Sequence, residues 1–403
     1  MLKRFAGIAA GTAIALGAFG TFLAVNWDYD NLVKDHPYVA YTNYSEQVRD
    51  FDYQRANYDA RTEQGDNPVL VFGSSELGPE RGTYYPAKFW TSSNYGMNIQ
   101  ACGKAYVTDL WDAVMIGAFA KDGINNNKVV ISLSMPWFLS ATHYGNEFQG
   151  RTFSPSALNA FLDNDELSDD LKDEVLTQLR SHKVMFGSNP LLQSVRSFDT
   201  VATAFESSVH LRYRTITQSS DSDSLDYGAY GSYNQKIPSS RFGELQTPDW
   251  DEIQQLAQDE VKKNSTNNDM GVGDKWYENN YQGWLWYTSG WNVDPDNLLD
   301  KSEIEEFQLT LRTCKEAGLD VLVLLNPVNG MCWDQCPVKQ EYRNAYYDTI
   351  RECCAAYDAQ VADLSGCEDT KYFFRDSEHP SEYGWSIINQ AIYEFYMGNG
   401  ESE

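Results

Sequence analysis

Two short stretches, far apart in the chain, carry the residue types that serine-dependent acyl transfer requires. Ser74 and Ser75 come directly after a glycine and the apolar run 69–72, and Asp376 precedes His379 by three positions near the other end. A nucleophilic serine needs a base beside its hydroxyl and a carboxylate that orients this base. Asp376 and His379 supply both if Nδ1 donates to the carboxylate while Nε2 faces the serine. Each stretch alone also suits an ordinary turn or loop, but the ordered pair predicts a nucleophile and its base.

The elements that must position these residues form a β-α series. Residues 68–73 are an apolar run with proline at its start, which predicts a buried strand that stops in a tight turn. Further strands are expected at 94–99, 128–134, 319–325 and 359–363, with amphipathic helices between them. This rhythm predicts an α/β fold, a three-layer α/β/α sandwich around a mostly parallel sheet of five strands. Ligands of such sheets lie at the carboxyl ends of the strands, where the serines and the histidine loop are expected to meet.

Two further residues lie near predicted strand ends. Gly103 belongs to a stretch, 101–104, that is expected to be a turn opening a helix over 107–118. A glycine there would let the backbone approach a ligand closely, although a plain loop glycine fits equally well. Trp137 follows the third strand, where it either walls a pocket or caps the core, and the cap is the preferred interpretation.

The N-terminus predicts a membrane anchor. Lys3 and Arg4 precede a stretch, 5–25, that contains no charged residue and is long enough to cross a bilayer. The positive-inside rule places the two basic residues in the cytoplasm and the rest of the chain outside the cell. A cleaved signal peptide is the alternative, but its apolar region is normally shorter. The expected organisation is therefore a cytoplasmic tip and anchor at 1–26, a stalk or lead-in at 27–66, and an extracellular domain at 67–403.

Composition excludes some classes of function. The net charge of −27 argues against nucleic-acid binding, which needs a basic surface. The histidines and cysteines show no metal-binding spacing, so neither a metal site nor a cofactor is expected. Cys332 and Cys336 are close enough in sequence for a loop disulfide outside the cell.

The more polar region at about 150–300 is expected to be a helical insertion over the sheet. Its late tryptophans either line a substrate groove or anchor the insertion.

The combination of motifs resembles the SGNH (GDSL-like) hydrolases, in which the nucleophile is the third residue of Gly-Asp-Ser-Leu. The corresponding Gly73-Ser74-Ser75-Glu76 selects Ser75 over Ser74. The chain is more closely similar to the DltD family, membrane-anchored proteins of teichoic-acid D-alanylation. The stretches that carry this similarity are Phe72-Gly73-Ser74-Ser75-Glu76-Leu77, Asn326-Pro327-Val328-Asn329-Gly330 followed by Trp333, Glu341-Tyr342-Arg343 with Tyr346-Tyr347, and Asp376-Ser377-Glu378-His379 with Gly384-Trp385.

The resemblance implies a triad of Ser75, His379 and Asp376 on an SGNH fold that faces outward. It implies backbone N–H groups of Ser75 and Gly103 as oxyanion donors. The family's third donor, an asparagine in a Gly-x-Asn-Asp block, has no counterpart after the third strand, where Ser134-Met135-Pro136-Trp137 occurs instead. Asn329 and Trp137 are candidate substrate-binding residues.

The resemblance also implies a reaction and its partners. D-alanyl groups would pass through an acyl-serine to lipoteichoic acid, together with a membrane O-acyltransferase and a D-alanyl carrier protein. Two alternatives remain open from the sequence. The same triad would serve an O-acetyl transferase or esterase acting on another surface glycan. A non-catalytic membrane scaffold for the D-alanylation machinery would instead tolerate loss of the serine.

Overall fold

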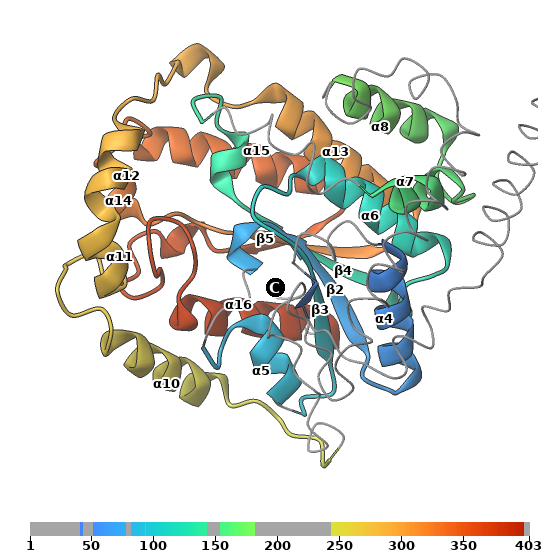
Figure 1. The fold of residues 1–403 in the computed structure, drawn as a ribbon, viewed down its shortest axis with the longest axis horizontal. Coiled ribbons are helices and arrows are strands. Elements are labelled where there is room, and N and C mark those ends of the chain that lie inside the picture. The colour runs from blue at the N-terminus through green and yellow to red at the C-terminus, as the bar shows by residue number, and fades with distance from the viewer. Residues whose placement is uncertain are drawn as a thin grey trace, which may run out of the picture.

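A single parallel sheet organises the protein. The computed structural model describes residues 41–42, 51–77, 82–92, 94–142, 154–181 and 243–398 of the 403-residue chain. Its strands follow the order β1-β3-β2-β4-β5-β6, and each described pair of neighbours is parallel (Figure 1). Their bounds are β1 (Tyr41–Thr42), β2 (Pro68–Gly73), β3 (Asn98–Gly103), β4 (Lys128–Leu133), β5 (Asp320–Leu325) and β6 (Gln360–Asp363). The expected α/β fold with a parallel sheet is confirmed.

The strands lie where apolar runs are long and buried on both faces. All six residues of β2 are buried, as are five of the six in each of β4 and β5, because helices cover both sides of a parallel sheet. The strand expected at 94–99 actually spans Asn98–Gly103, so the prediction that 101–104 forms a turn was wrong. The two-residue strand β1 was not expected; it pairs with β3 through Tyr41 and Ala101.

Helices cover the sheet on both faces (Figure 1). Those outside the expected insertion are α4 (Phe51–Glu63), α5 (Pro86–Ser92), α6 (Asp109–Lys121), α13 (Lys301–Glu316), α14 (Gly330–Trp333), α15 (Gln340–Ala356) and α16 (Glu382–Met397). Helices α4, α6 and α13 pack on one face, whereas α5 and α16 pack on the other. This division follows from right-handed crossovers: the chain moves from β2 out to β3, then turns back past β2 to β4 and β5.

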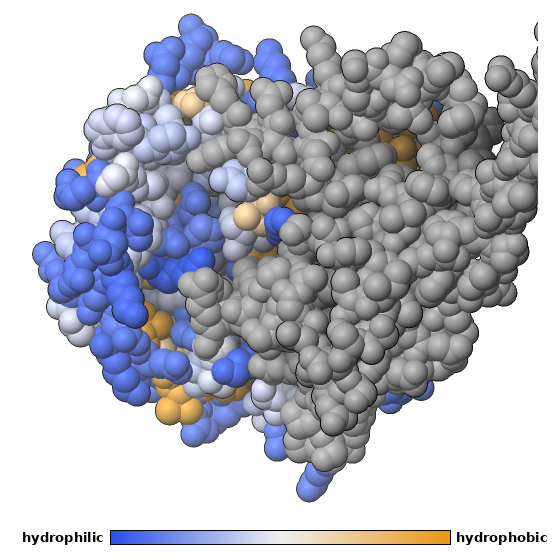
Figure 2. Space-filling model, viewed as in Figure 1, coloured by the Kyte–Doolittle hydropathy of each residue, from blue (hydrophilic) through white to orange (hydrophobic). Residues whose placement is uncertain are grey.

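The expected insertion contributes helices around this core. The described ones are α7 (Pro155–Leu162), α8 (Asp169–Ser181), α10 (Trp250–Lys262), α11 (Asp274–Asn279) and α12 (Tyr281–Thr288). Helices α7 and α8 pack against α6, while α10 packs along α16. The described part of the face in Figure 2 is mostly hydrophilic, with small separate apolar patches.

Part of the sequence prediction falls outside the described residues. The expected anchor at 5–25 and most of the expected stalk belong to this part, as does 182–242 within the insertion. Among the residues that are described, no helix combines the length and the apolar character that crossing a bilayer needs.

Candidate active site

Three predicted residues meet at the carboxyl edge of the sheet. Ser75 is the first residue of the short 3₁₀ helix η1 (Ser75–Leu77), which is separated from β2 by one residue, Ser74. Its Oγ lies 2.8 Å from Nε2 of His379, although the two residues are 304 positions apart in sequence. The other ring nitrogen of His379, Nδ1, lies 3.0 and 2.9 Å from the two carboxylate oxygens of Asp376. The structure thus brings together a hydroxyl, an imidazole and a carboxylate in the order that activates a nucleophile.

The loop that carries the histidine is fixed by its own backbone. Asp376 Oδ1 accepts hydrogen bonds from the N–H groups of Glu378 at 3.0 Å and His379 at 2.8 Å. The loop is also held from outside, because the Ser377 carbonyl accepts from the N–H of Asn329 at 2.9 Å and from Nε1 of Trp333 at 3.0 Å. Asn329 is the N-cap of α14 and Trp333 is its last residue, so both partners belong to the segment that follows β5. The imidazole therefore has a fixed orientation before any substrate binds.

Electrostatic interactions within this loop favour the charged pair. Burial raises the pKa of Asp376, but the charge and hydrogen bond of His379, together with the Arg375 charge, outweigh burial and hold this pKa well below its usual range. Burial lowers the pKa of His379, but the charge and hydrogen bond of Asp376 raise it to about 9. His379 thus holds a proton more tightly than a free imidazole does, and its neutral form is the one that can accept the serine proton.

The two serines of the turn have different surroundings. Ser74 Oγ donates to the Lys104 carbonyl at 3.3 Å, on the loop after β3, whereas only Ser75 faces the imidazole among the contacts of this turn. Glu76 stabilises the turn, since its buried Oε1 accepts from the N–H of Ser74 at 2.9 Å. Burial raises the pKa of Glu76, and the Ser74 N–H opposes this rise. Ser75 is thus the serine that the geometry favours as nucleophile.

Gly103 is placed by a close approach between strands. It is the last residue of β3 and lies opposite Gly73 in the register of β2. A Cβ atom at Gly103 would lie 1.9 Å from the carbonyl oxygen of Gly73. The residue must be glycine for the two strands to reach the site side by side. Its N–H remains a candidate oxyanion donor beside that of Ser75.

The two candidate substrate-binding residues differ in position. Trp137, in η3 (Met135–Phe138), is half-buried, packs edge-to-face on Tyr106 and borders a cavity of about 10 Å³ beside Ser74. This space is roughly the size that one water molecule needs. Asn329 instead caps α14: its side chain accepts from the N–H of Cys332 at 3.0 Å, and it is only 3% exposed. Asn329 therefore supports the histidine loop through its backbone, and we assign it no contact with a substrate.

The chain is similar to known proteins over most of its length. The family model described as "DltD protein" matches residues 41–397. Protein DltD of Bacillus subtilis (strain 168) is 24% identical over 329 residues, which cover 81% of each chain. Protein DltD of Staphylococcus aureus (strain NCTC 8325 / PS 47) is 23% identical over 345 residues, which cover 83% of this chain and 82% of that protein.

The chain belongs to the DltD family. The resemblance noted in the sequence is confirmed, and the family match spans the sheet, the nucleophile turn and the histidine loop together.

Sequence reasoning missed several residues that support this DltD-family site. The clearest are Ser132 at the end of β4 and Asn326 just after β5, whose Nδ2 donates to Ser132 Oγ at 2.8 Å and to the Leu133 carbonyl at 3.1 Å. A usable signal existed, because each is a polar residue within or just after an otherwise apolar run. The suggested disulfide was wrong, since Cys332 and Cys336 are both buried free thiols.

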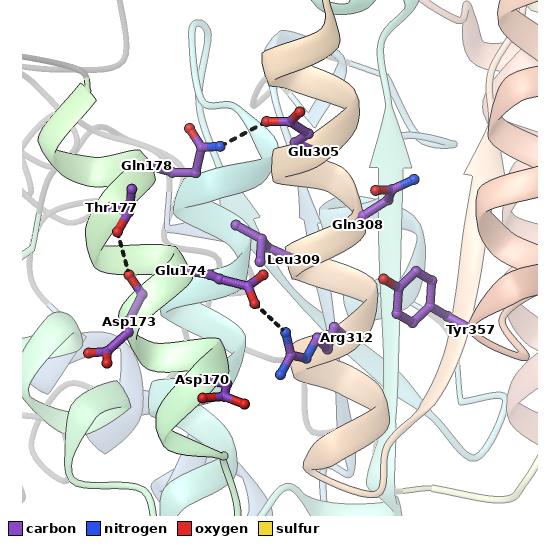
Figure 3. A pocket seen from close by; sticks show the side chains of 10 residues that line it. All are labelled: Asp170, Asp173, Glu174, Thr177, Gln178, Glu305, Gln308, Leu309, Arg312 and Tyr357. Carbon is purple, nitrogen blue, oxygen red and sulfur yellow. Dashed lines mark hydrogen bonds and ion pairs between the residues drawn. The ribbon is translucent and has the colours of Figure 1, made fainter.

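A larger cavity, of about 440 Å³, lies away from this site between α8 and α13 (Figure 3). It is lined mainly by acidic and amide side chains, and its Arg312 already pairs with Glu174 at 3.0 Å. Tyr357, which also lines it, comes just before β6 and so lies toward the amino end of that strand. The cavity therefore lies toward the amino ends of the strands, whereas Ser75 lies at their carboxyl ends. Within the described ranges, no group of histidine, cysteine or acidic side chains could hold a metal ion.

Proposed function

We propose that the protein is a serine acyltransferase or esterase that forms an acyl-Ser75 intermediate. The observation that carries this proposal is the 2.8 Å contact of Ser75 Oγ with Nε2 of His379, whose Nδ1 contacts Asp376. In the first step His379 removes the proton from Ser75 Oγ while this oxygen attacks the carbonyl carbon of the donor ester or thioester. The protonated imidazole then gives its proton to the leaving oxygen or sulfur, and an acyl ester on Ser75 remains.

The second half of the reaction repeats these roles. His379 removes a proton from an acceptor hydroxyl, whose oxygen attacks the acyl carbon. Collapse of the tetrahedral intermediate returns the proton to Ser75 Oγ and releases the new ester. Backbone N–H groups of Ser75 and Gly103 are the donors that we assign to the oxyanion. Transfer exceeds hydrolysis only where the acceptor hydroxyl replaces water at this position.

For the acyl group and the acceptor we propose D-alanyl and a teichoic or lipoteichoic acid polymer. Membership of the DltD family supports this choice. The proposed partners are the membrane O-acyltransferase and the D-alanyl carrier protein of D-alanylation. We further propose that residues 5–25 anchor the chain in the cell membrane with the catalytic domain outside. Such a tether would raise the local concentration of partners, which matters because a chain of net charge −27 repels a polyphosphate polymer.

The test is covalent labelling of the full-length chain in detergent micelles with a fluorophosphonate probe, followed by peptide mass spectrometry. We expect modification of Ser75 in the wild type and its loss in Ser75→Ala and in His379→Ala. Ser74→Ala is the matched control, since this neighbouring hydroxyl contacts the Lys104 carbonyl instead of the imidazole. Ser75→Ala should also abolish D-alanyl ester on the polymer in a complemented deletion strain. Full D-alanylation by that variant would refute the acyl-Ser75 mechanism.

A further inference from the structure

An arginine shares the carboxylate that orients the catalytic imidazole. Nε of Arg375 lies 3.3 Å from Oδ2 of Asp376, and the same oxygen lies 2.9 Å from Nδ1 of His379. The guanidinium and the imidazole therefore bind one carboxylate oxygen from two directions. Arg375 lies outside the Asp-x-x-His motif, and the mechanism above gives it no part.

The arginine is held in this position by its own set of contacts. Its N–H donates to the His379 carbonyl at 3.0 Å, and its carbonyl accepts from the N–H of Gly273 at 2.9 Å. The guanidinium donates to the hydroxyl of Tyr85, which itself donates to the Pro380 carbonyl at 3.2 Å. The side chain of Arg375 is 31% exposed, compared with 12% for Asp376. A cation is thus fixed at the rim of the triad.

The charges around the imidazole act in opposite directions. Asp376 and Glu378, from the same loop, favour its protonation, whereas Arg375 disfavours it. Glu76 of η1 also faces His379, and burial raises the pKa of both this carboxyl and that of Glu378. Burial therefore opposes ionisation of both glutamic acids, whereas Asp376 and Arg375 favour their charged forms. The Cys332 thiol of α14 and the Tyr85 hydroxyl, which also border Asp376, favour their neutral forms because burial raises the pKa of each to about 12.

We propose that Arg375 is a positioning residue that shares the Asp376 carboxylate with His379 and thereby keeps the imidazole neutral at a lower pH than Asp376 alone would allow. The benefit to catalysis rests on the proposed role of His379 as the base for Ser75. A lone buried carboxylate would hold the imidazole protonated, and a protonated imidazole cannot accept the serine proton. The arginine offsets part of this effect while leaving the carboxylate in place to orient the ring.

The test is a histidine titration of the full-length chain in detergent micelles, with ¹³C-labelled histidine followed by NMR. The His379 signal is assigned by its absence in His379→Gln. Arg375→Gln, and Arg375→Met, which retains the aliphatic stem, should raise the titration midpoint by about one pH unit. Arg375→Lys keeps the charge and should titrate close to the wild type. The matched control for loss of a positive charge is Arg312→Gln, at the distant α8–α13 cavity, which should leave the midpoint unchanged.

The same variants are then compared by fluorophosphonate labelling of Ser75 across the pH range. We expect the rise of the labelling rate with pH to move upward by the same interval as the NMR midpoint, while the rate at alkaline pH stays within about threefold of the wild type. A purely structural role would lower the rate at every pH without moving the midpoint. An unchanged or lowered His379 midpoint in both Arg375→Gln and Arg375→Met would overturn the proposal. Absence of Ser75 labelling in the wild type would instead count against the proposed function, and the NMR titration would still decide the role of Arg375.

Discussion

We expect Asp109→Asn to stabilise the protein at neutral pH and to weaken the pH dependence of its stability. Asp109 is the first residue of α6, is 5% exposed, and borders the small cavity beside Ser74. Its carboxyl lies against that of Glu303, with Glu306 and Glu76 nearby. Burial, with the charges of Glu306 and Glu76, raises the pKa of Asp109 from 3.8 to about 8, although the hydrogen bond with Glu303 opposes the rise. The folded protein therefore binds a proton that the unfolded chain releases.

The size and sign of the effect follow from this difference in proton binding. Between pH 3.8 and about 8 the folded state holds one more proton at Asp109 than the unfolded state. The free energy of unfolding then falls by about 1.4 kcal/mol for each pH unit, or about 3 kcal/mol between pH 5 and pH 7. Stability from this group is thus greatest at low pH and is lost as the pH rises. Asparagine binds no proton in either state, so the substitution removes this slope.

The assay is urea unfolding of the full-length chain in detergent micelles, followed by tryptophan fluorescence at pH 5, 6, 7 and 8. The stability of Asp109→Asn relative to the wild type should grow steadily with pH over this range. Asp251→Asn is the control, because this exposed acid lies in the first turn of α10 and also loses a charge near a helix N-terminus. That loss is worth about 0.3–1 kcal/mol and should not change over this pH range. The reasoning fails if Asp109→Asn is no more stable than the wild type and the difference between their free energies of unfolding stays constant from pH 5 to pH 8.

Substitutions at three further residues test how Ser75 and the histidine loop are supported. Glu76→Gln keeps an oxygen that accepts from the Ser74 N–H and should label at close to the wild-type rate, whereas Glu76→Ala leaves this N–H unsatisfied and should cost about 1–3 kcal/mol of stability in a urea titration. Gly103→Ala forces a methyl group against the Gly73 carbonyl, so we expect a loss of about 3 kcal/mol or more and little Ser75 labelling; a normal thermal midpoint would contradict this. Trp333→Phe removes one hydrogen bond to the histidine loop, which is worth about 1 kcal/mol. We expect this variant to label Ser75 more slowly than the wild type while its unfolding midpoint falls only slightly.

The sequence predicted strands well where burial alone decides the residue types. β2, β4 and β5 are continuous apolar runs, and their expected bounds were correct to within one residue. β3 was expected at 94–99 but spans Asn98–Gly103, and its polar Asn98 and Gln100 are both buried, so polarity alone did not show where the strand begins and ends. Asp66 accepts from Asn98 at 2.8 Å, and Asn57 donates to Gln100 at 2.7 Å. These partners lie more than thirty positions away, and a single sequence does not show that such polar groups are satisfied.

In the site, too, local sequence patterns were predictable and contacts formed only in the folded structure were not. Ser75, Asp376 and His379 were predictable because a turn after a strand and an Asp-x-x-His loop are local patterns. The influence of Arg375 was not, since its importance depends on a shared carboxylate oxygen and not on its place in the chain. Resemblance selected Ser75 over Ser74, and the structure gives the physical reason, which is that the two hydroxyl groups have different partners.

The tryptophans of the insertion connect it to the histidine loop. Trp333 is fully buried, and the rings of Trp284 and Trp291 pack on it at centroid distances of 6.1 and 5.6 Å. The same Trp333 donates to the Ser377 carbonyl, two positions before His379. Helices α12 and α14 lie next to each other, at the left of Figure 1. The sequence left open whether these tryptophans line a groove or anchor the insertion, and for Trp284 and Trp291 the contacts favour the anchor. Because that anchor also holds the histidine loop, changes in the end of the insertion should alter the orientation of the base, even though no residue there touches Ser75 in the described structure.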